Sequence, residues 1–208
     1  MQHINFILLS SSLALVATGC TTMSVTKLQT QKADTYEQHT EIGGLVIGVY
    51  PMTDKAEVKR MFNVNLLDKG ILPILLVAEN RNPSSSFIIA KGKVFVLSEE
   101  TYATSTSQRK EVTSGQLAAG SVIALVGPIF VGLKMVSDAT VIEHNIADKE
   151  FYSRTLGPGQ KAQGFIYFQF PKTAPPAGGY HVIAQIKNPS TEETIPFDLK
   201  VNLALAKP

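Results

Sequence analysis

Residues 70–80 read Gly-Ile-Leu-Pro-Ile-Leu-Leu-Val-Ala-Glu-Asn, and this stretch decides the fold. The run from Ile71 to Ala78 is almost wholly apolar, which is typical of a strand whose sheet is covered on both faces. Because Pro73 has no N–H to donate, it should lie near the start of the strand or at a bulge. We therefore expect a core strand over residues 70–80, followed by a turn at Asn-Arg-Asn-Pro, residues 80–83.

Further short apolar segments, separated by Pro, Gly and Asn turns, precede and follow this strand. They cover residues 43–52, 87–90, 93–97, 162–170, 180–186 and 195–203. In the last of them Phe197, Leu199, Val201 and Leu203 alternate with polar residues, which is the period of a half-buried strand. About six to eight short strands with such turns predict a mainly β protein with an antiparallel β-sandwich.

One short helix is expected after the first strand. Asp54 can cap it, and Glu57 follows three residues later, as in a capping box. Val58, Met61 and Phe62 then fall on one face at helical spacing. We expect this helix to pack over an edge of the sandwich.

Residues 158–168 read Pro-Gly-Gln-Lys-Ala-Gln-Gly-Phe-Ile-Tyr-Phe. A Pro-Gly turn that introduces a Gly-x-x-x-Phe strand resembles the late strands of immunoglobulin-like modules in bacterial surface and periplasmic lipoproteins. The resemblance implies an immunoglobulin-like sandwich. We place Phe165 and Tyr167 on one face of this strand, and Ile166, Phe168 and Phe170 on the other.

Residues 13–20 read Leu-Ala-Leu-Val-Ala-Thr-Gly-Cys and close a mostly apolar run that begins at Ile4. The run suits the apolar part of a signal peptide and is short for a membrane span. The stretch resembles the lipobox of bacterial lipoproteins, whose cysteine is acylated and becomes the first residue of the mature chain. The resemblance implies lipid attachment at Cys20; a plain secretory signal is the alternative.

These features predict three regions along the chain. Residues 1–19 are a lipoprotein signal peptide, and residues 20–41, which are polar, are a flexible tether. Residues 42–208 form the β-sandwich domain, with an apolar helical insertion at about 115–152. Residues 138–154, which include the end of that insertion, read as an amphipathic helix, with Val141, Ile142, Ile146 and Phe151 apolar.

The insertion begins with an unusual apolar segment, residues 117–136, in which Lys134 is the only charged residue. Three alternatives stay open for it: a core helix or helical hairpin, a segment that dips into the membrane or packs against another copy, and a single span. A span is disfavoured because the strands on both sides should share one sandwich. The candidate membrane or partner contacts are Ile123, Val126, Ile129, Phe130 and Leu133.

Composition argues against several kinds of chemistry. The net charge of +2 is too small to favour nucleic acid. The single cysteine is the predicted lipid site, and the four histidines, at positions 3, 39, 144 and 181, have no metal-ligand spacing. No nucleophile elbow or phosphate-binding loop occurs in the sequence. We therefore expect no enzyme, cofactor or metal.

The leading hypothesis is a non-enzymatic, envelope-anchored lipoprotein that binds or scaffolds a protein partner of unknown identity. Its membrane contact would be the N-terminal lipid. Thr21 follows the cysteine, and in Gram-negative lipoproteins a neutral residue there is typical of outer-membrane sorting. The alternative is a membrane-active or oligomer-forming envelope component that uses residues 117–136.

Overall fold

The computed structural model describes residues 28, 31–99, 103, 145–170 and 177–204. Within them, eight strands form two antiparallel four-stranded sheets. Sheet A has the order β1 (Gln38–Ile42), β2 (Leu45–Pro51), β3 (Ile71–Asn80) and β6 (Lys161–Gln169). Sheet B has the order β5 (Arg154–Leu156), β4 (Phe87–Ser98), β7 (Ala177–Lys187) and β8 (Thr194–Ala204).

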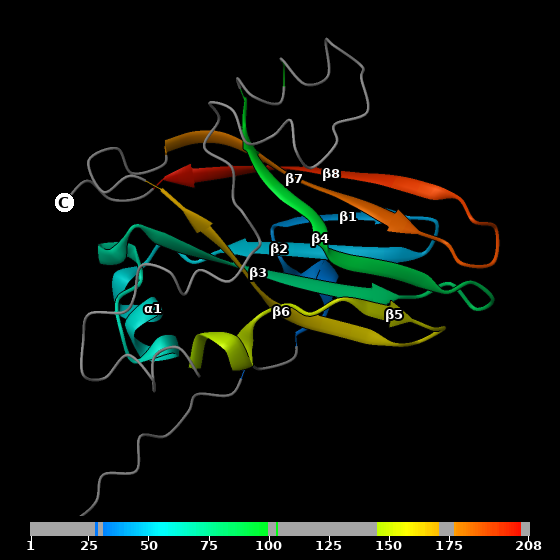
Figure 1. The fold of residues 1–208 in the computed structure, drawn as a ribbon, viewed down its shortest axis with the longest axis horizontal. Coiled ribbons are helices and arrows are strands. Elements are labelled where there is room, and N and C mark those ends of the chain that lie inside the picture. The colour runs from blue at the N-terminus through cyan, green and yellow to red at the C-terminus, as the bar shows by residue number, and fades with distance from the viewer. Residues whose placement is uncertain (1–27, 29–30, 100–102, 104–144, 171–176, 205–208) are drawn as a thin grey trace, which may run out of the picture.

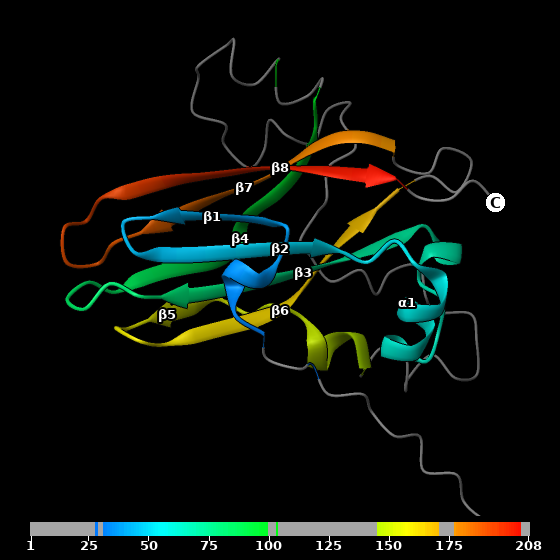
Figure 2. The ribbon, with the colours of Figure 1, turned by 180° about the vertical axis from the view of Figure 1, so that it is seen from behind.

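The two sheets stack as a sandwich, with sheet B toward the viewer in Figure 1 and sheet A toward the viewer in Figure 2. The helical segments include η1 (Ala33–Thr35), α1 (Lys55–Phe62), η2 (Leu67–Lys69) and residues 145–149. The predicted mainly β class and antiparallel sandwich are confirmed. Of the predicted helical insertion, the described part contains the helix at 145–149.

Strand β3 lies at the centre of this arrangement, as its sequence predicts. All ten of its residues are buried, and it pairs with β2 on one side and β6 on the other. Pro73 stands third in the strand, opposite Tyr167 of β6. The apolar run therefore marks a strand with both faces covered, as expected.

One face of β3 looks into the space between the sheets. Side chains from both sheets fill it, and Phe168 of β6 meets Tyr180 of β7 edge to face at 5.5 Å between ring centroids. The buried apolar residues that face this space include Leu45, Ile47, Val49, Leu72, Ile74, Leu76, Ala78, Ile166 and Phe168 of sheet A, and Phe87, Ile89, Val94, Val96, Leu156, Val182, Ala184, Ile186, Phe197, Val201 and Leu203 of sheet B.

The outer face of sheet A is covered by a second apolar layer. Phe62, the last residue of α1, packs its ring against Phe165 at 5.0 Å and Tyr167 at 6.0 Å between centroids. Tyr167 donates a hydrogen bond of 2.8 Å to the carbonyl of Ile146 in helix 145–149. The predicted division of β6 into a Phe165–Tyr167 face and a Phe168 face is confirmed, and both faces are buried.

Helix α1 forms as its sequence predicts. The Asp54 side chain accepts a 2.7 Å hydrogen bond from the backbone N–H of Glu57. Val58 and Phe62 are fully buried, and Met61 is partly buried against the core. Asn63, with φ of 60°, ends the helix in the left-handed conformation.

Along the strand order the chain changes sheet three times, from β3 to β4, from β5 to β6 and from β6 to β7. In the first, buried Asn80 donates from its amide nitrogen to the carbonyls of Ser85 (2.7 Å) and Leu156 (2.9 Å), which fixes the predicted turn. Just before β5, Glu150 forms an isolated parallel bridge with Phe165 at the β6 edge of sheet A. Gly164 permits this approach, since a Cβ there would lie 2.6 Å from the Cα of Phe151.

Three expectations need correction. The tether predicted for residues 20–41 is wrong from Ala33 on, because η1 and β1 belong to the sandwich. Residues 87–90 and 93–97 are one strand, β4, whose pairing with β7 shifts between Ile89 and Val94. The helix predicted for 138–154 ends at 149, and 154 begins β5; the backbone of Phe151 donates to the carbonyl of Phe165 instead.

Phe168→Ala should lower the free energy of unfolding by about 3–5 kcal/mol, because it empties a fully buried position between the sheets. Denaturant melts measure this loss. Tyr152→Ala is the control: this ring is 49% exposed, and its removal should cost no more than about 1 kcal/mol. Equal losses for the two variants would mean that Phe168 does not face the core.

Candidate functional site

The residues predicted from sequence to contact lipid or a partner lie outside the described residues. They are Cys20, Ile123, Val126, Ile129, Phe130 and Leu133, and His144 lies outside as well. Among the described residues, no helix is long and apolar enough to cross a membrane. These predictions remain predictions.

The two described histidines lie in separate surroundings. His39 Nδ1 is 2.7 Å from the carbonyl oxygen of Tyr36, on the exposed strand β1. His181 Nδ1 is 2.7 Å from a carboxylate oxygen of Asp198, across the β7–β8 pair. Within the part of the chain that the structure describes, no group of three or more His, Cys, Asp or Glu could hold a metal.

A second polar cluster lies beside His181 on sheet B. Lys200 of β8 makes a 2.5 Å ion pair with Glu99, and both side chains are more than half exposed. The hydrogen bond from Lys200 lowers the pKa of the Glu99 carboxyl. An exposed pair of this kind contributes little to stability, so this cluster reads as a solvated surface.

Helix 145–149 places one lysine in the protein interior. Lys149 is 5% exposed, donates to the side-chain oxygen of Asn145 and lies 6.0 Å from the centre of the Phe62 ring. Asn145 in turn donates a 2.8 Å bond to the carbonyl of Phe62. Burial lowers the pKa of Lys149. These contacts fasten the helix to α1, which is a structural role.

The most extensive polar site of the described chain lies where the N-terminal segment meets sheet A. Leu28 packs against the hydrophobic core, and its carbonyl accepts a 3.4 Å bond from Gln163 of β6. Ala33 of η1 is fully buried against β2. We call this contact region the N-terminal clasp: Leu28 and η1 on one side, and Gly48, Glu79, Arg81, Lys161 and Gln163 of sheet A on the other.

Gly48 allows η1 to approach β2. Its backbone stands against the carbonyl of Ala33, so that a Cβ at this position would overlap that oxygen and come within 2.9 Å of the Tyr36 ring. Tyr36 itself lies 6.1 Å from Tyr50, centroid to centroid, on the same outer face. The missing side chain at Gly48 therefore lets the N-terminal segment pack directly against β2.

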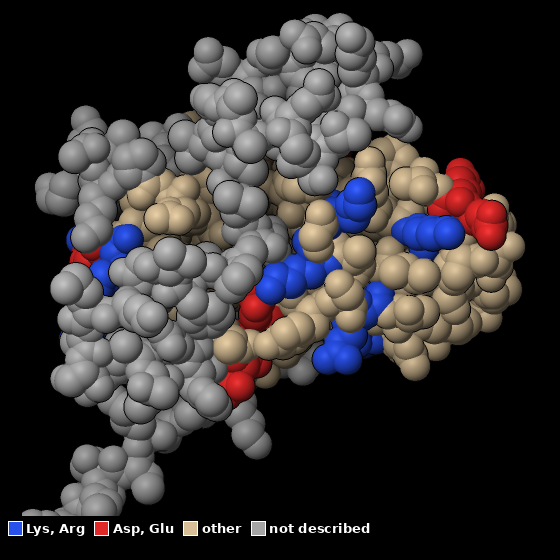
Figure 3. Space-filling view, viewed as in Figure 1, with Lys and Arg blue, Asp and Glu red and all other residues tan. Residues whose placement is uncertain are grey.

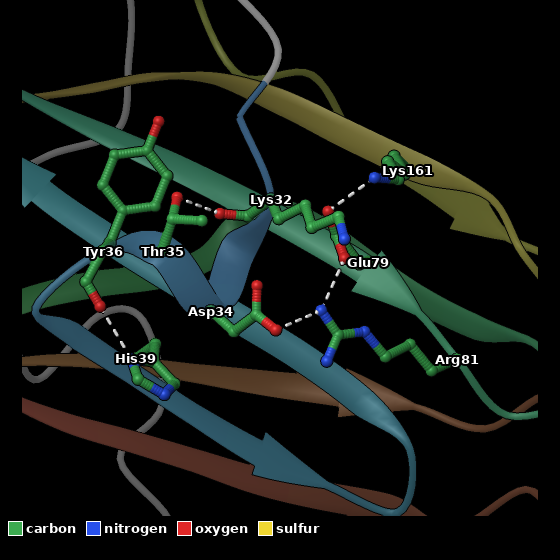
Figure 4. A network of polar contacts seen from close by, with 8 residues as sticks. All are labelled: Lys32, Asp34, Thr35, Tyr36, His39, Glu79, Arg81 and Lys161. Carbon is green, nitrogen blue, oxygen red and sulfur yellow. Dashed lines mark hydrogen bonds and ion pairs between the residues drawn. The ribbon is translucent and has the colours of Figure 1, made fainter.

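Glu79 is the charged centre of the clasp (Figure 4). Its side chain is only 5% exposed and takes ion pairs from Lys161 at 2.7 Å and Arg81 at 3.0 Å. Arg81 also reaches Asp34 of η1 at 2.8 Å. Two cations around one buried carboxylate therefore tie β3, β6 and η1 together.

The pKa of Glu79 is lowered from its ordinary value of 4.5. Burial by itself raises this pKa, but the hydrogen bonds from Lys161, Arg81 and the backbone of Ala33 outweigh it. The folded protein thus favours the charged carboxylate. Hydrogen bonds to a buried charge are among the stronger ones, about 1.5–3 kcal/mol each.

Sequence reasoning missed the clasp, although two signals were present. Glu79 is the only charged residue in the apolar strand, and a buried charge requires partners. Gly48 interrupts the β-branched run of β2. The partners, however, come from positions as distant as Lys161, which spacing along the chain does not connect.

The clasp has a plain mechanical consequence: it fixes the chain that arrives from the N-terminus onto the sandwich. Any force or constraint applied upstream of Leu28 is transmitted through it.

No family model matches this chain, and no curated protein matches it.

Gly48→Ala should push η1 off sheet A and lower the free energy of unfolding by about 1–3 kcal/mol. Limited proteolysis should then cleave near residues 31–37 faster than in the wild type. Gly92→Ala is the matched control, since a Cβ there meets nothing within 4 Å, and its effect should stay below about 1 kcal/mol. Similar cleavage of both variants would show that η1 does not depend on Gly48.

Glu79→Gln should destabilise the protein by about 2 kcal/mol at neutral pH, because Lys161 and Arg81 both lose the carboxylate with which they form ion pairs. The depressed pKa means that this stabilisation is complete above pH 4.5 and is lost as the pH falls through the folded-state pKa. Denaturant melts should therefore show a gap between wild type and variant that narrows in acid. Glu37→Gln, exposed on the same segment, should show almost no gap; a Glu79→Gln gap independent of pH would contradict the account.

Proposed function

We propose that this protein is a lipid-anchored, non-enzymatic binding or scaffold module of a bacterial cell envelope. One observation carries the proposal: a lipobox-like stretch ends at Cys20, and only eight residues later Leu28 is already packed against the sandwich. An acylated Cys20 would thus be joined to a folded domain by a very short connection. The same segment serves as anchor and as part of the fold.

The physical chemistry of the anchor supports a stable membrane attachment. A single acyl chain binds a bilayer marginally, whereas two or more hold a protein firmly. The lipoprotein resemblance implies a diacylated thiol at Cys20. If the cell is Gram-negative, Thr21 favours the outer membrane.

The sandwich supports a scaffold role. Its buried polar side chains are used to hold elements together: Glu79 joins the clasp, Asn80 the first crossing between the sheets, and Asn145 the contact of helix 145–149 with α1. Such a domain offers surfaces in fixed positions relative to the membrane. A protein partner, of identity unknown, is the proposed occupant of one such surface.

A second function is favoured by the apolar segment 117–136, with Lys134 as its only charge. In that proposal the protein dips into the bilayer or self-associates through this segment. Cross-linking in intact membranes distinguishes the two: a variant lacking residues 117–136 keeps its cross-linked products under the first proposal and loses them under the second.

Cys20→Ala should abolish acylation and leave a precursor that still carries residues 1–19. Metabolic labelling with a fatty acid, followed by electrophoresis of the protein, measures both effects in one experiment. Cys20 is the only cysteine of the chain, so no other thiol can take the label. Label retained by the alanine variant would end the lipoprotein proposal.

A further inference from the structure

The β5 side of sheet B carries a group of basic side chains, partly on its outer face and partly at the β5 edge. Figure 3 shows Lys and Arg gathered over β4, β5 and the end of β7. We call this the basic face, and it consists of Lys91, Lys93, Arg154 and Lys187.

Most of this charge is uncompensated. Lys91 pairs with Glu150 at 2.6 Å. The other three, Lys93, Arg154 and Lys187, are exposed and make no ion pair within the described residues. Glu192 and Glu193 lie in the turn between β7 and β8, beyond the end of β7 that carries Lys187.

An aliphatic side chain lies within the basic face. Ile88 of β4 stands opposite Thr155 of β5 and Lys187 of β7, and it is only partly buried. Arg154 stands opposite buried Ile89, yet it is exposed because β5 is the edge strand of sheet B. Its side chain therefore leaves the sandwich at the edge where β5 and β6 approach each other.

The N-terminal segment joins the sandwich at this same edge. Leu28 is bonded to Gln163 of β6, the edge strand of sheet A that lies beside β5. Eight residue steps separate Leu28 from Cys20, and a fully extended chain of that length spans about 28 Å. A lipid on Cys20 thus keeps the β5–β6 edge within about 28 Å of the bilayer.

We infer that the basic face contacts the anionic phospholipid headgroups of the membrane that holds the anchor. The inference rests on the proposed lipid anchor and adds an orientation: the sandwich lies with its β5–β6 edge toward the bilayer, and Lys93, Arg154 and Lys187 reach phosphate groups. Ile88 adds a small apolar contact between them. The opposite edge, β1 and β8, faces away from the lipid and presents the surface for a partner.

The positive charges of the basic face favour binding to an anionic membrane surface. A Lys or Arg close to an anionic bilayer strengthens its binding about fivefold, and the effect falls off within a Debye length. The short connection from Cys20 raises the local concentration of the face at the bilayer, so three weak contacts act together. The contact should be lost in zwitterionic vesicles and in high salt.

The test uses the acylated full chain in vesicles, with one fluorophore attached to an introduced cysteine. Thr155→Cys reports the β5 edge, and Asn202→Cys on β8 reports the opposite edge of sheet B; both residues are exposed. A headgroup spin label on the lipid quenches a nearby fluorophore. In vesicles that contain phosphatidylglycerol, quenching at position 155 should exceed quenching at position 202 about fivefold, and in phosphatidylcholine alone this excess should vanish.

Charge reversal tests the residues themselves. K93E, R154E and K187E together should remove the excess quenching at position 155. The matched control reverses three exposed lysines on α1 and η2, K55E, K59E and K69E, and should keep it.

The outcomes separate the anchor from the orientation. Protein that stays on the vesicles but shows equal quenching at the two positions overturns the inference and leaves the anchor standing. An excess that survives the reversal at Lys93, Arg154 and Lys187 also overturns it. Protein that does not stay on vesicles of either composition removes the proposed function and, with it, this inference.

Discussion

Burial of sheet A on both of its faces is the constraint on which the rest of the structure depends. Strand β3 has all ten residues out of water, so it needs a cover on each side. Sheet B covers one face. Phe62, helix 145–149 and η1 cover the other, and each of them is held by contacts made to β2, β3 or β6 or to one another. Elements that look peripheral in the sequence are therefore parts of the core.

The sequence predicts well those elements whose signals are local. Strands β3 and β6 and helix α1 each carry their pattern within about a dozen residues: an apolar run, two alternating faces, and a cap followed by helical spacing. Phe168 could be placed in the core for the same reason. The sandwich then follows from the number of strands and from the turns between them.

Features that depend on distant partners could not be predicted in this way. Strand β1 reads Gln-His-Thr-Glu-Ile, which resembles a polar linker, and only its pairing with β2 makes it a strand. The partners of Glu79 are Arg81, Lys161 and the backbone of Ala33 in η1. The basic face draws on β4, β5 and β7. In each case separate elements must come together before the site exists.

The clasp restricts how far the sandwich can lie from an anchor in the N-terminal region. A long flexible tether would fix neither the distance between the sandwich and the bilayer nor the orientation of the sandwich. With Leu28 and η1 fixed, a lipid on Cys20 constrains both the distance of the sandwich from the bilayer and its orientation.

Neutron reflectometry of the acylated protein on a supported bilayer measures the distance between bilayer and sandwich most directly. The account predicts that the protein layer begins within about 28 Å of the headgroups, the reach of eight extended residues. A wider layer of water between bilayer and protein would contradict it, because the N-terminal segment would then have to leave the sandwich.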